Sequence, residues 1–259
     1  MYKEERRKIV LNLLKEKGSI GVNDLAEMFH VSGSTIRQDL HMLEAQGNIT
    51  RTHGGAVLSA SSSKLAKEAP YSQRKNQREK TAIARKALDY VGCKDILLLD
   101  TGTTMWAFAR ELVKADKNLT GAVLYSNDLA VLQLLEERED LELHMLGGRI
   151  RNGYHYTYGQ QMKNELSGYH FPKLFLAASA LSGAALTTSN SELAMMKRAM
   201  IDCSKEVYLL MDSSKINHVT FQEFGRLSDI TLMITDGGIS ESDASRIRKY
   251  TELVIATED

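Results

Sequence analysis

The segment DTGTT, Asp100 to Thr104, combines a glycine with hydroxyl side chains in a pattern that suits the binding of an anion. It follows the apolar run Ile96 to Leu99 and precedes a helical pattern from Met105 to Val113, so we expect a strand-to-helix turn. A glycine beside threonines at a helix N-terminus offers backbone N–H groups, hydroxyl donors and a favourable dipole, for which phosphate is the natural ligand. The same residues also suit a simple helix cap, so the motif alone leaves both interpretations open.

Other short polar or glycine clusters follow apolar runs in the same way. The carboxyl ends of parallel strands lie on one edge of a sheet, where ligands bind. Several clusters on that edge would converge, so the sequence predicts a pocket there. The clusters are Ser126 to Asp128, Gly147 and Gly148, Ser179, and Asp212 to Lys215.

The elements that would position these clusters alternate between strand and helix patterns. Near-continuous apolar strands separated by helices imply an α/β domain with a mostly parallel sheet covered on both faces. We expect a first helix over 71–91 and further helices over 105–113, 128–137 and 192–204. The expected strands are 96–99, 122–125, 141–146, 174–178, 207–211, 232–234 and 253–256.

A second group of polar side chains lies on a helix expected from Gly33 to Gln46, with Ser32 as its N-cap. Ile36, Leu40 and Leu43 recur at i, i+4 and i+7, so one stripe packs inward. Short polar groups near the N-terminus of such a helix can reach base edges in the major groove of DNA. Taken alone, the pattern equally describes an amphipathic helix with a solvated face. The outer and flanking side chains are Ser34, Thr35, Arg37, Gln38 and His41.

A hairpin is expected after this helix, with residues 48–51 paired to 56–58 and Gly47 ending the helix. The glycines at 54 and 55 supply the positive φ values of a tight turn. Arg51 and His53 would then lie on a wing beside the phosphates of DNA.

The order of elements before the hairpin completes a winged helix-turn-helix: a helix over 3–17, a strand over 19–22, and a helix over 23–29. The small, polar stretch SASSSKLAKEAP, residues 59–70, is typical of a flexible linker. The expected domains are therefore 1–58 for DNA binding and 71–259 for a second function.

The run LAEMFHVSGSTIRQDLHMLEAQGNITRTHGGA, residues 25–56, closely resembles the N-terminal domain of the DeoR-type family of bacterial transcriptional repressors. The resemblance implies binding to a double-stranded DNA operator. Two positions depart from the family pattern. Gly33 weakens the first turn of the helix, and Gln38 stands where a second arginine commonly follows Arg37. The Gln38 amide suits adenine, so this departure bears on the operator sequence.

The second half of the chain resembles the C-terminal sensor domain of the same family, a Rossmann-like domain similar to the ribose-5-phosphate isomerase and CoA-transferase fold. The matching pieces are DTGTT, SN at 126–127, LGGRIR at 146–151, MKRAMID at 196–202 and DSSK at 212–215. One segment departs from the pattern: Pro172 and Ala180 stand where the family often has aspartate and glycine. This departure bears on the identity of the ligand.

The resemblance implies a phosphorylated sugar as effector, bound without a cofactor or metal. Its phosphate would contact Gly102, Thr103 and Thr104, Lys215 would supply a counter-charge, and Asn127 and Arg149 would contact the sugar or the anion. The residues implied for this site are Asp100, Gly102, Thr103, Thr104, Ser126, Asn127, Gly147, Gly148, Arg149 and Lys215.

An aromatic patch, YHYTY from Tyr154 to Tyr158, belongs to no motif described above. Packing in the core or between subunits is the favoured interpretation, and a place in the pocket wall is the alternative.

Composition and charge are consistent with a cytoplasmic, two-domain DNA-binding protein. The 259 residues are 43% hydrophobic with a net charge of zero, and no apolar run reaches the ~20 residues of a membrane span. Residues 1–86 carry 16 Lys and Arg against 9 Asp and Glu, whereas the remainder carries 17 against 24. A basic front half fits phosphate contacts, and an acidic remainder would be repelled by DNA. Cys93 and Cys203 form no metal or redox motif, and the histidines are scattered.

We therefore expect a homo-oligomeric repressor, dimer or tetramer, of a carbohydrate-catabolism operon. An activator would show the same sequence features, because the position of the operator decides whether the bound protein represses or activates transcription. The alternative from another class is a sugar-phosphate isomerase with an appended DNA-binding domain. Such an enzyme needs a carboxylate base; Asp100, Glu192, Asp212 and Lys215 are chemically capable, but residues 178–188 lack the acidic cluster of an isomerase.

Overall fold

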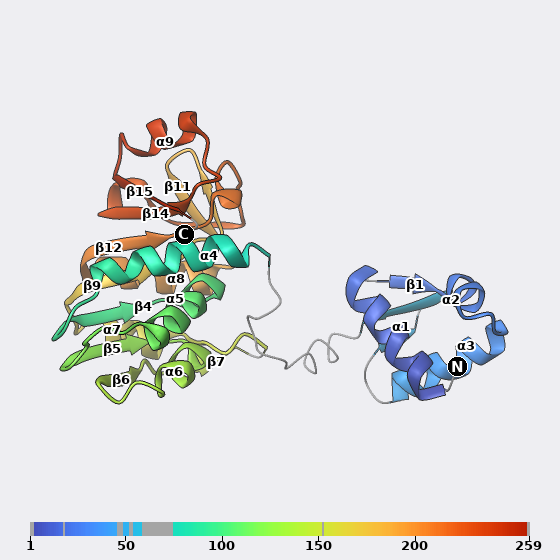
Figure 1. Cartoon of the computed structure of the whole chain (residues 1–259). Helices are drawn as coiled ribbons and strands as arrows, with labels where there is room; N and C mark the ends of the chain where they lie inside the picture. Colours follow the sequence, from blue (N-terminus) through green and yellow to red (C-terminus); the bar gives the residue numbers. More distant parts are fainter. Residues whose placement is uncertain are drawn as a thin grey trace. The chain divides into compact units, whose positions relative to one another are not determined.

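The computed structural model describes residues 3–17, 19–45, 49–51, 54–58, 75–151 and 153–257. The chain divides into two compact units, residues 1–69 and 70–259, which are described separately (Figure 1). The linker expected over 59–70 lies outside the described residues, so its nature stays a prediction.

The N-terminal unit has the element order of a winged helix-turn-helix, as expected. Its three strands form an antiparallel sheet in the order β1-β3-β2. The expected helix end at Gln46 and Gly47 and the turn residues Thr52 and His53 lie outside the described residues. The elements are α1 (Lys3–Lys17), β1 (Ser19–Gly21), α2 (Val22–Phe29), α3 (Gly33–Ala45), β2 (Ile49–Arg51) and β3 (Gly55–Leu58).

The core of this unit follows from helical periodicity. Ile36, Leu40 and Leu43 of α3 are buried, and they pack with Leu14 of α1 and Leu25 of α2. The inward stripe predicted from their spacing is therefore confirmed, and the polar side of α3 is left outside.

The second unit is built on a seven-stranded sheet in which every neighbouring pair is parallel. Each of the seven predicted apolar runs contributes one strand, which confirms the predicted fold class. The sheet order is β15-β14-β12-β9-β4-β5-β6. The strands are β4 (Ile96–Leu99), β5 (Ala122–Ser126), β6 (Leu141–Met145), β9 (Phe171–Leu176), β12 (Ser204–Leu210), β14 (Leu232–Asp236) and β15 (Glu252–Ala256).

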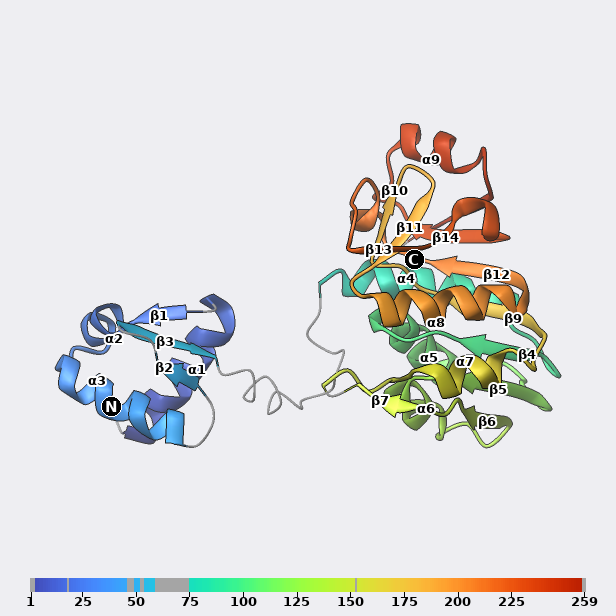
Figure 2. The ribbon, with the colours of Figure 1, turned by 180° about the vertical axis from the view of Figure 1, so that it is seen from behind.

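Helices cover both faces of this sheet. Figure 1 shows α4 (Gln77–Ala87), α5 (Thr103–Lys114) and α6 (Leu129–Leu135) on one face. Figure 2 shows α7 (Gln160–Leu166) and α8 (Ser191–Asp202) on the other face. α9 (Glu241–Ile247) precedes the edge strand β15. Because successive residues of a strand point to opposite faces, the sheet contributes side chains to two separate hydrophobic cores.

The two cores divide the apolar residues of β4. Leu97 packs with Ile83 of α4 and Phe108 of α5, whereas Leu98 packs with Met162 of α7 and Met200 of α8. Both faces of the strand are thus buried, which explains why its sequence is continuously apolar rather than alternating.

Several elements differ from their predicted bounds; β12, for example, begins at Ser204 rather than at Val207. Residues 71–74 of the first expected helix lie outside the described residues. The helix expected over 71–91 is α4, Gln77–Ala87, followed by the 3-10 helix η2 (Leu88–Tyr90); Asn76 precedes it with a left-handed φ of 61°. The strand expected over 174–178 is β9, which begins at Phe171 and ends at Leu176, so Ala177 and Ala178 leave the sheet.

Short strands that pair across long sequence distances were not predicted, because their few residues lack a readable periodicity. β10 (Ala180–Ser182), β11 (Ala185–Thr188) and β13 (Gln222–Arg226) form an antiparallel sheet. β7 (Arg149–Ile150) and β8 (Thr157–Tyr158) form a hairpin. The 3-10 helices η3 (Ser213–Lys215) and η4 (Leu227–Asp229) complete the unit.

The strand order reverses between β4 and β9. From β4 the chain proceeds through β5 to the edge strand β6, and it then returns to place β9 on the other side of β4. In open α/β sheets the carboxyl ends of the two strands at such a reversal flank a crevice in which ligands bind.

Candidate functional site

A cavity of about 560 Å³ lies where the strand order reverses. Thr101 to Thr104, which follow β4, and Ala177 to Ser179, which follow β9, form part of its wall. Ser189 and Asn190 at the start of α8 and Lys215 after β12 add to it. The predicted pocket at the carboxyl edge of the sheet therefore exists.

The DTGTT turn presents an uncapped helix end to this cavity. Gly102 has a φ of 120°, which favours glycine, and provides no side chain to cap α5. The first backbone hydrogen bond of α5 in the described residues runs from Trp106 N–H to Gly102 O, at 2.9 Å. Asp128 Oδ2 holds the turn by accepting from Thr101 Oγ1 at 2.5 Å and from Gly102 N–H at 3.2 Å. The amides of the first turn remain available to an anion.

Thr104 has a buried hydroxyl that is not satisfied by the described residues. This residue lines the cavity and is only 1% exposed, yet its Oγ1 has no hydrogen-bond partner among the described residues. A buried hydroxyl without a partner costs about 1–3 kcal/mol, so a ligand atom that accepts or donates here would recover that free energy.

The cavity is strongly basic. Five basic side chains line it, and no Asp or Glu does so in the described part of the chain. Two of the five have buried carboxylate partners: Lys197 donates to Asp100, and Lys215 Nζ lies 3.3 Å from Asp212 Oδ2. The remaining three are Lys75, Arg151 and Lys80; the Lys80 Nζ donates to the Lys75 carbonyl, and its charge helps to lower the pKa of Asp212.

Burial lowers the pKa of Lys215, and the charge of Lys197 lowers it further, while Asp212 opposes both effects. The pKa of Asp212 is itself lowered: burial alone would raise it, but Lys215 and hydrogen bonds from Ser214 and Asn76 outweigh burial. An anion in the cavity would favour the charged form of Lys215 and so raise its pKa.

Four of the ten residues predicted for the effector site line this cavity: Gly102, Thr103, Thr104 and Lys215. Asp100 lies beneath it, fully buried, and its Oδ2 accepts from the Ala177 amide at 3.0 Å as well as from Lys197. Asp100 therefore forms a buried ion pair with Lys197 and does not line the cavity itself.

The other five predicted residues lie outside the cavity lining and have structural contacts. Ser126 Oγ accepts from the Asp128 amide at 3.1 Å, and Asn127 Nδ2 donates to Thr157 O at 2.9 Å. Gly147 N–H donates to Glu165 at 3.1 Å.

Gly148 and Arg149 contact Tyr158. A Cβ on Gly148 would lie 2.7 Å from the Tyr158 carbonyl oxygen, so only glycine fits there. The Arg149 guanidinium lies 5.3 Å from the centroid of the Tyr158 ring. Both residues shape the β7–β8 hairpin.

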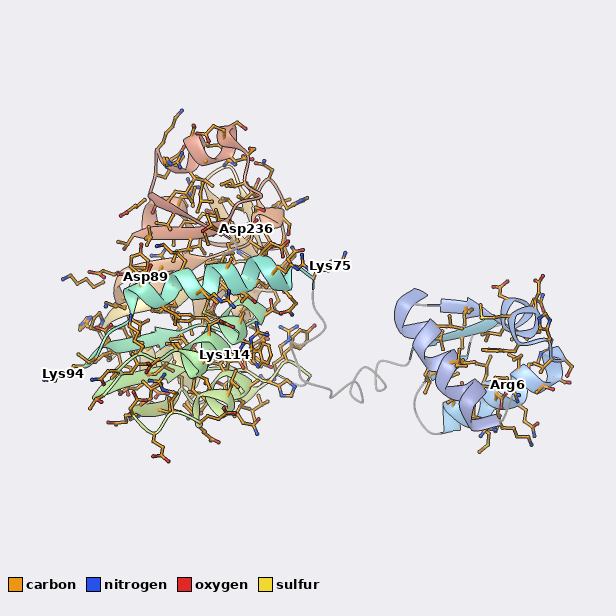
Figure 3. All side chains as sticks on the ribbon, in the orientation of Figure 1. Arg6, Lys75, Asp89, Lys94, Lys114 and Asp236 are labelled. Carbon is orange, nitrogen blue, oxygen red and sulfur yellow. The ribbon has the colours of Figure 1, made fainter. Side chains whose placement is uncertain are left out.

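Sequence reasoning missed several lining residues. One of them, Lys197, could have been recognised as a candidate. It is a lysine at a buried position of α8, next to the buried Met196. Lys75 and Lys80 gave no such signal, since they lie among many charges at the start of the domain; Figure 3 shows Lys75 beside the start of α4.

The aromatic patch divides between the two interpretations. Tyr154 and Tyr156 line the cavity, and Arg151 lies against both of them. Tyr156 and Tyr158 also belong to the buried core on the α8 face.

On the DNA-binding unit, α3 presents one exposed polar face. Ser34, Arg37, Gln38 and His41 are exposed and recur at i, i+3, i+4 and i+7. Ser32 caps the helix as predicted, because its Oγ accepts from Thr35 N–H at 3.2 Å. The half-buried Thr35 also bonds Ser32 through its hydroxyl, at 2.9 Å.

The wing residues lie mostly outside the described part of the chain. Arg51 ends β2, but its side chain is not described, and His53 lies outside the described residues. Their phosphate contacts stay a prediction.

Asp39 is a residue that sequence reasoning missed. It lies on α3, is 2% exposed, and accepts from Arg6 Nε at 2.6 Å and from Arg7 Nε at 2.9 Å. Both arginines belong to α1, on which Figure 3 labels Arg6. This double ion pair fixes α3 against α1 and thereby orients the exposed polar face.

The residues that an isomerase would need do not meet in the cavity. Of Asp100, Glu192, Asp212 and Lys215, only Lys215 lines it. Within the described ranges, no three His, Cys, Asp or Glu side chains gather as a metal site would require. No helix among the described residues has the length and apolar character of a membrane span.

Comparison with known families matches both units. The DeoR-like helix-turn-helix domain matches residues 6–62, and the DeoR C terminal sensor domain matches residues 75–237. The HTH-type transcriptional repressor GlcR of Bacillus subtilis is 31% identical over 100% of this chain and 98% of its own. The lactose phosphotransferase system repressor of Streptococcus mutans is 33% identical over 98% of this chain and 100% of its own.

Solved structures give weaker similarities. Ribose 5 phosphate isomerase A from Neisseria gonorrhoeae has a TM-score of 0.39 at 20% identity, over 54% of each chain. The full-length sorbitol operon regulator SorC from Klebsiella pneumoniae has a TM-score of 0.42 at 10% identity, over 92% of this chain and 97% of its own. With TM-scores below 0.5, neither similarity supports a conclusion.

Proposed function

This chain belongs to the DeoR-type family of transcription regulators, and we propose that it represses a carbohydrate-catabolism operon under the control of a phosphorylated sugar. Relatives that align over nearly the whole chain are named as transcriptional repressors, including repressors of the lactose phosphotransferase system. The chain is accordingly a regulator rather than an enzyme.

The proposed DNA contact is the exposed face of α3. Arg37 and Gln38 carry donors suited to guanine and adenine edges in the major groove, and Ser34 and His41 extend the same face. Thr35, Arg51 and His53 complete the proposed interface. Two subunits would place two such faces on paired half-sites, because the second contact is then intramolecular and strengthens binding.

The proposed effector site is the basic cavity. The observation that carries the proposal is the unpartnered hydroxyl of Thr104 at the uncapped start of α5, in a cavity lined by five basic and no acidic residues of the described chain. A phosphate would accept from the first-turn amides and from Thr104, with Lys215 and Lys80 as counter-charges. Lys75 and Lys197 belong to the same proposed site.

The same cavity offers a route from effector to DNA. Lys75 and Lys80 lie at the start of the sensor unit, directly after the segment that leads from the DNA-binding unit. A phosphate that pairs with these lysines would favour one arrangement of the subunits over another. Such a preference shifts the equilibrium of the oligomer and moves the recognition helices off their half-sites.

A test uses the full chain and its Thr104→Val variant. Phosphorylated sugars and their unphosphorylated parents are screened by thermal shift, where a ligand at 100 times its Kd stabilises the protein by about 2.7 kcal/mol. We expect shifts with phosphorylated compounds only, and their loss in Thr104→Val.

The variant itself should fold normally, because valine replaces an unpartnered buried hydroxyl by a methyl group of similar volume. Its affinity for DNA duplexes selected from a random pool by the wild-type protein should be unchanged without effector. Weakened DNA binding in the absence of effector would mean that Thr104 is structural, and equal shifts with unphosphorylated sugars would contradict the phosphate site.

A further inference from the structure

Two hydrophobic side chains next to β13 are presented to solvent. Val219 and Phe221 are 71% and 76% exposed, more than any other large hydrophobic residue of the described chain. Thr220 between them is anchored, because its N–H and its hydroxyl both donate to Thr187 Oγ1 of β11, at 3.0 and 2.9 Å. The exposure of Val219 and Phe221 is therefore a property of a fixed segment.

An open groove of about 640 Å³ begins at Gln222, the residue after Phe221. It lies between α8 and β13, which pack against each other (Figure 2). Met195 of α8 lines the groove and is itself 42% exposed. One surface thus carries projecting apolar side chains and, beside them, a recess with apolar lining. Such a combination is typical of a protein interaction site.

The charges around the groove are balanced. Among the described residues, four charged side chains line it: Arg198 pairs with Asp229 at 2.9 Å, and Arg226 pairs with Glu223 at 3.1 Å. DNA and anionic membranes attract surfaces with an excess of basic side chains, which this surface lacks. A second copy of the chain offers the matching set, because it presents an apolar ring, an apolar recess and both signs of charge.

We infer that this groove is an interface between two copies of the chain, related by a two-fold axis, in which Phe221 of each copy enters the groove of the other. The two β13 strands run antiparallel across the axis, so that Glu223 of each copy faces Arg226 of the other. A parallel arrangement would place like charges opposite each other. This contact deepens the proposed function, which rests on two subunits occupying paired half-sites.

α8 borders both the groove and the basic cavity. Leu193 and Lys197 line the cavity, whereas Met195 and Arg198 line the groove. Any displacement of α8 therefore changes both places together. By linkage, effector binding and subunit association then alter each other.

The first test measures the mass of the full chain by sedimentation equilibrium, without DNA or effector. Phe221→Ser removes the projecting ring, and Tyr250→Ser is the control, because Tyr250 is also 50% exposed but does not line the groove. We expect the wild type and Tyr250→Ser to associate equally. Phe221→Ser should raise the dissociation constant of this contact by at least about 30-fold, as loss of an aromatic anchor does. Thermal unfolding checks that the variant still folds.

The second test addresses the antiparallel arrangement. Glu223→Arg and Arg226→Glu each place like charges opposite each other, so each variant alone should associate more weakly than the wild type. A mixture of the two restores opposite charges at both contacts, and the mixed dimer should exceed its statistical share by about fivefold. The control is the mixture of Glu241→Arg with Arg248→Glu, an exposed ion pair at α9, which should assemble statistically.

The outcomes separate this interface from the proposed function. A monomeric wild type, unchanged association of Phe221→Ser, or statistical mixing of the Glu223 and Arg226 variants would each overturn the interface. If Phe221→Ser stays as oligomeric as the wild type, another contact joins the subunits and the proposed function survives. If the wild type binds operator DNA only as a monomer, the paired half-sites of the proposed function fail as well.

Discussion

Asn76 donates a hydrogen bond of 2.9 Å to Asp212 Oδ1, and so connects the residue before α4 to the loop that carries Lys215. The same amide nitrogen donates to Ser214 Oγ at 2.8 Å. The segment that enters the sensor unit is therefore bonded directly to the wall of the basic cavity, across 136 residues of sequence.

Replacement of Asn76 by glycine should separate effector binding from its effect on DNA. Glycine tolerates the left-handed φ of 61°, so the backbone is retained while both side-chain hydrogen bonds are lost. We expect effector affinity to change by less than about fivefold, near 1 kcal/mol for the lost bonds, while the effector no longer releases DNA. DNA affinity with and without effector is the measurement, and a normal release by effector would contradict this route.

Asp39→Asn should destabilise the DNA-binding unit. The change leaves the 6%-exposed side chain of Arg6 without its carboxylate, and breaking a buried ion pair in this way costs about 3–5 kcal/mol. Denaturant unfolding of the full chain should show an earlier first transition and an unchanged second one. Asp24→Asn, at an exposed position of α2, is the control and should leave both transitions unchanged.

Arg37→Ala should weaken operator binding by about 1–3 kcal/mol if Arg37 reads a base. Competition between the selected duplex and unrelated duplex at fixed salt measures the specific part of this loss. Effector affinity should be unaffected, since Arg37 is an exposed residue of the other unit. An equal loss for both duplexes would indicate a phosphate contact instead.

The affinity for a sugar phosphate should fall with rising pH. Burial lowers the pKa of Lys215 below its ordinary 10.5, and the ligand requires the charged lysine. Binding is thus strongest below the pKa of Lys215 in the free protein and weakens as the pH rises through it. Above pH ~7.5 the phosphate is fully dianionic, because its second pKa is about 6. The decline in affinity above this pH therefore reports a titration of the protein and not of the ligand.

Lys215→Arg is the control for this pH dependence. Arginine keeps its charge throughout the range, so the affinity of this variant should decline less than that of the wild type between pH 7.5 and 10. A decline of equal size in both proteins would exclude Lys215 as its source.

Local sequence patterns were enough to predict most of the helices and strands, and they led to the proposal of an anion site. The helical period of 3.6 predicted that Ile36, Leu40 and Leu43 of α3 face the core. The seven apolar runs became seven parallel strands because strands buried on both faces are mostly apolar. The turn at Gly102 to Thr104 could be proposed as an anion site from the sequence, because its donors are local and arise from a helix end and adjacent hydroxyls.

Which distant side chains share the cavity could not be predicted from local patterns and follows from the packing of the folded unit. Lys80 of α4, Lys197 of α8 and Arg151 after β7 all line it, although they are far apart in the sequence. Ser126 and Asn127 lie at the correct edge yet bond to the neighbouring backbone. The physical reason is that position along a strand predicts the edge of the sheet that a residue reaches. The direction of its side chain depends on packing between segments that are far apart in the sequence.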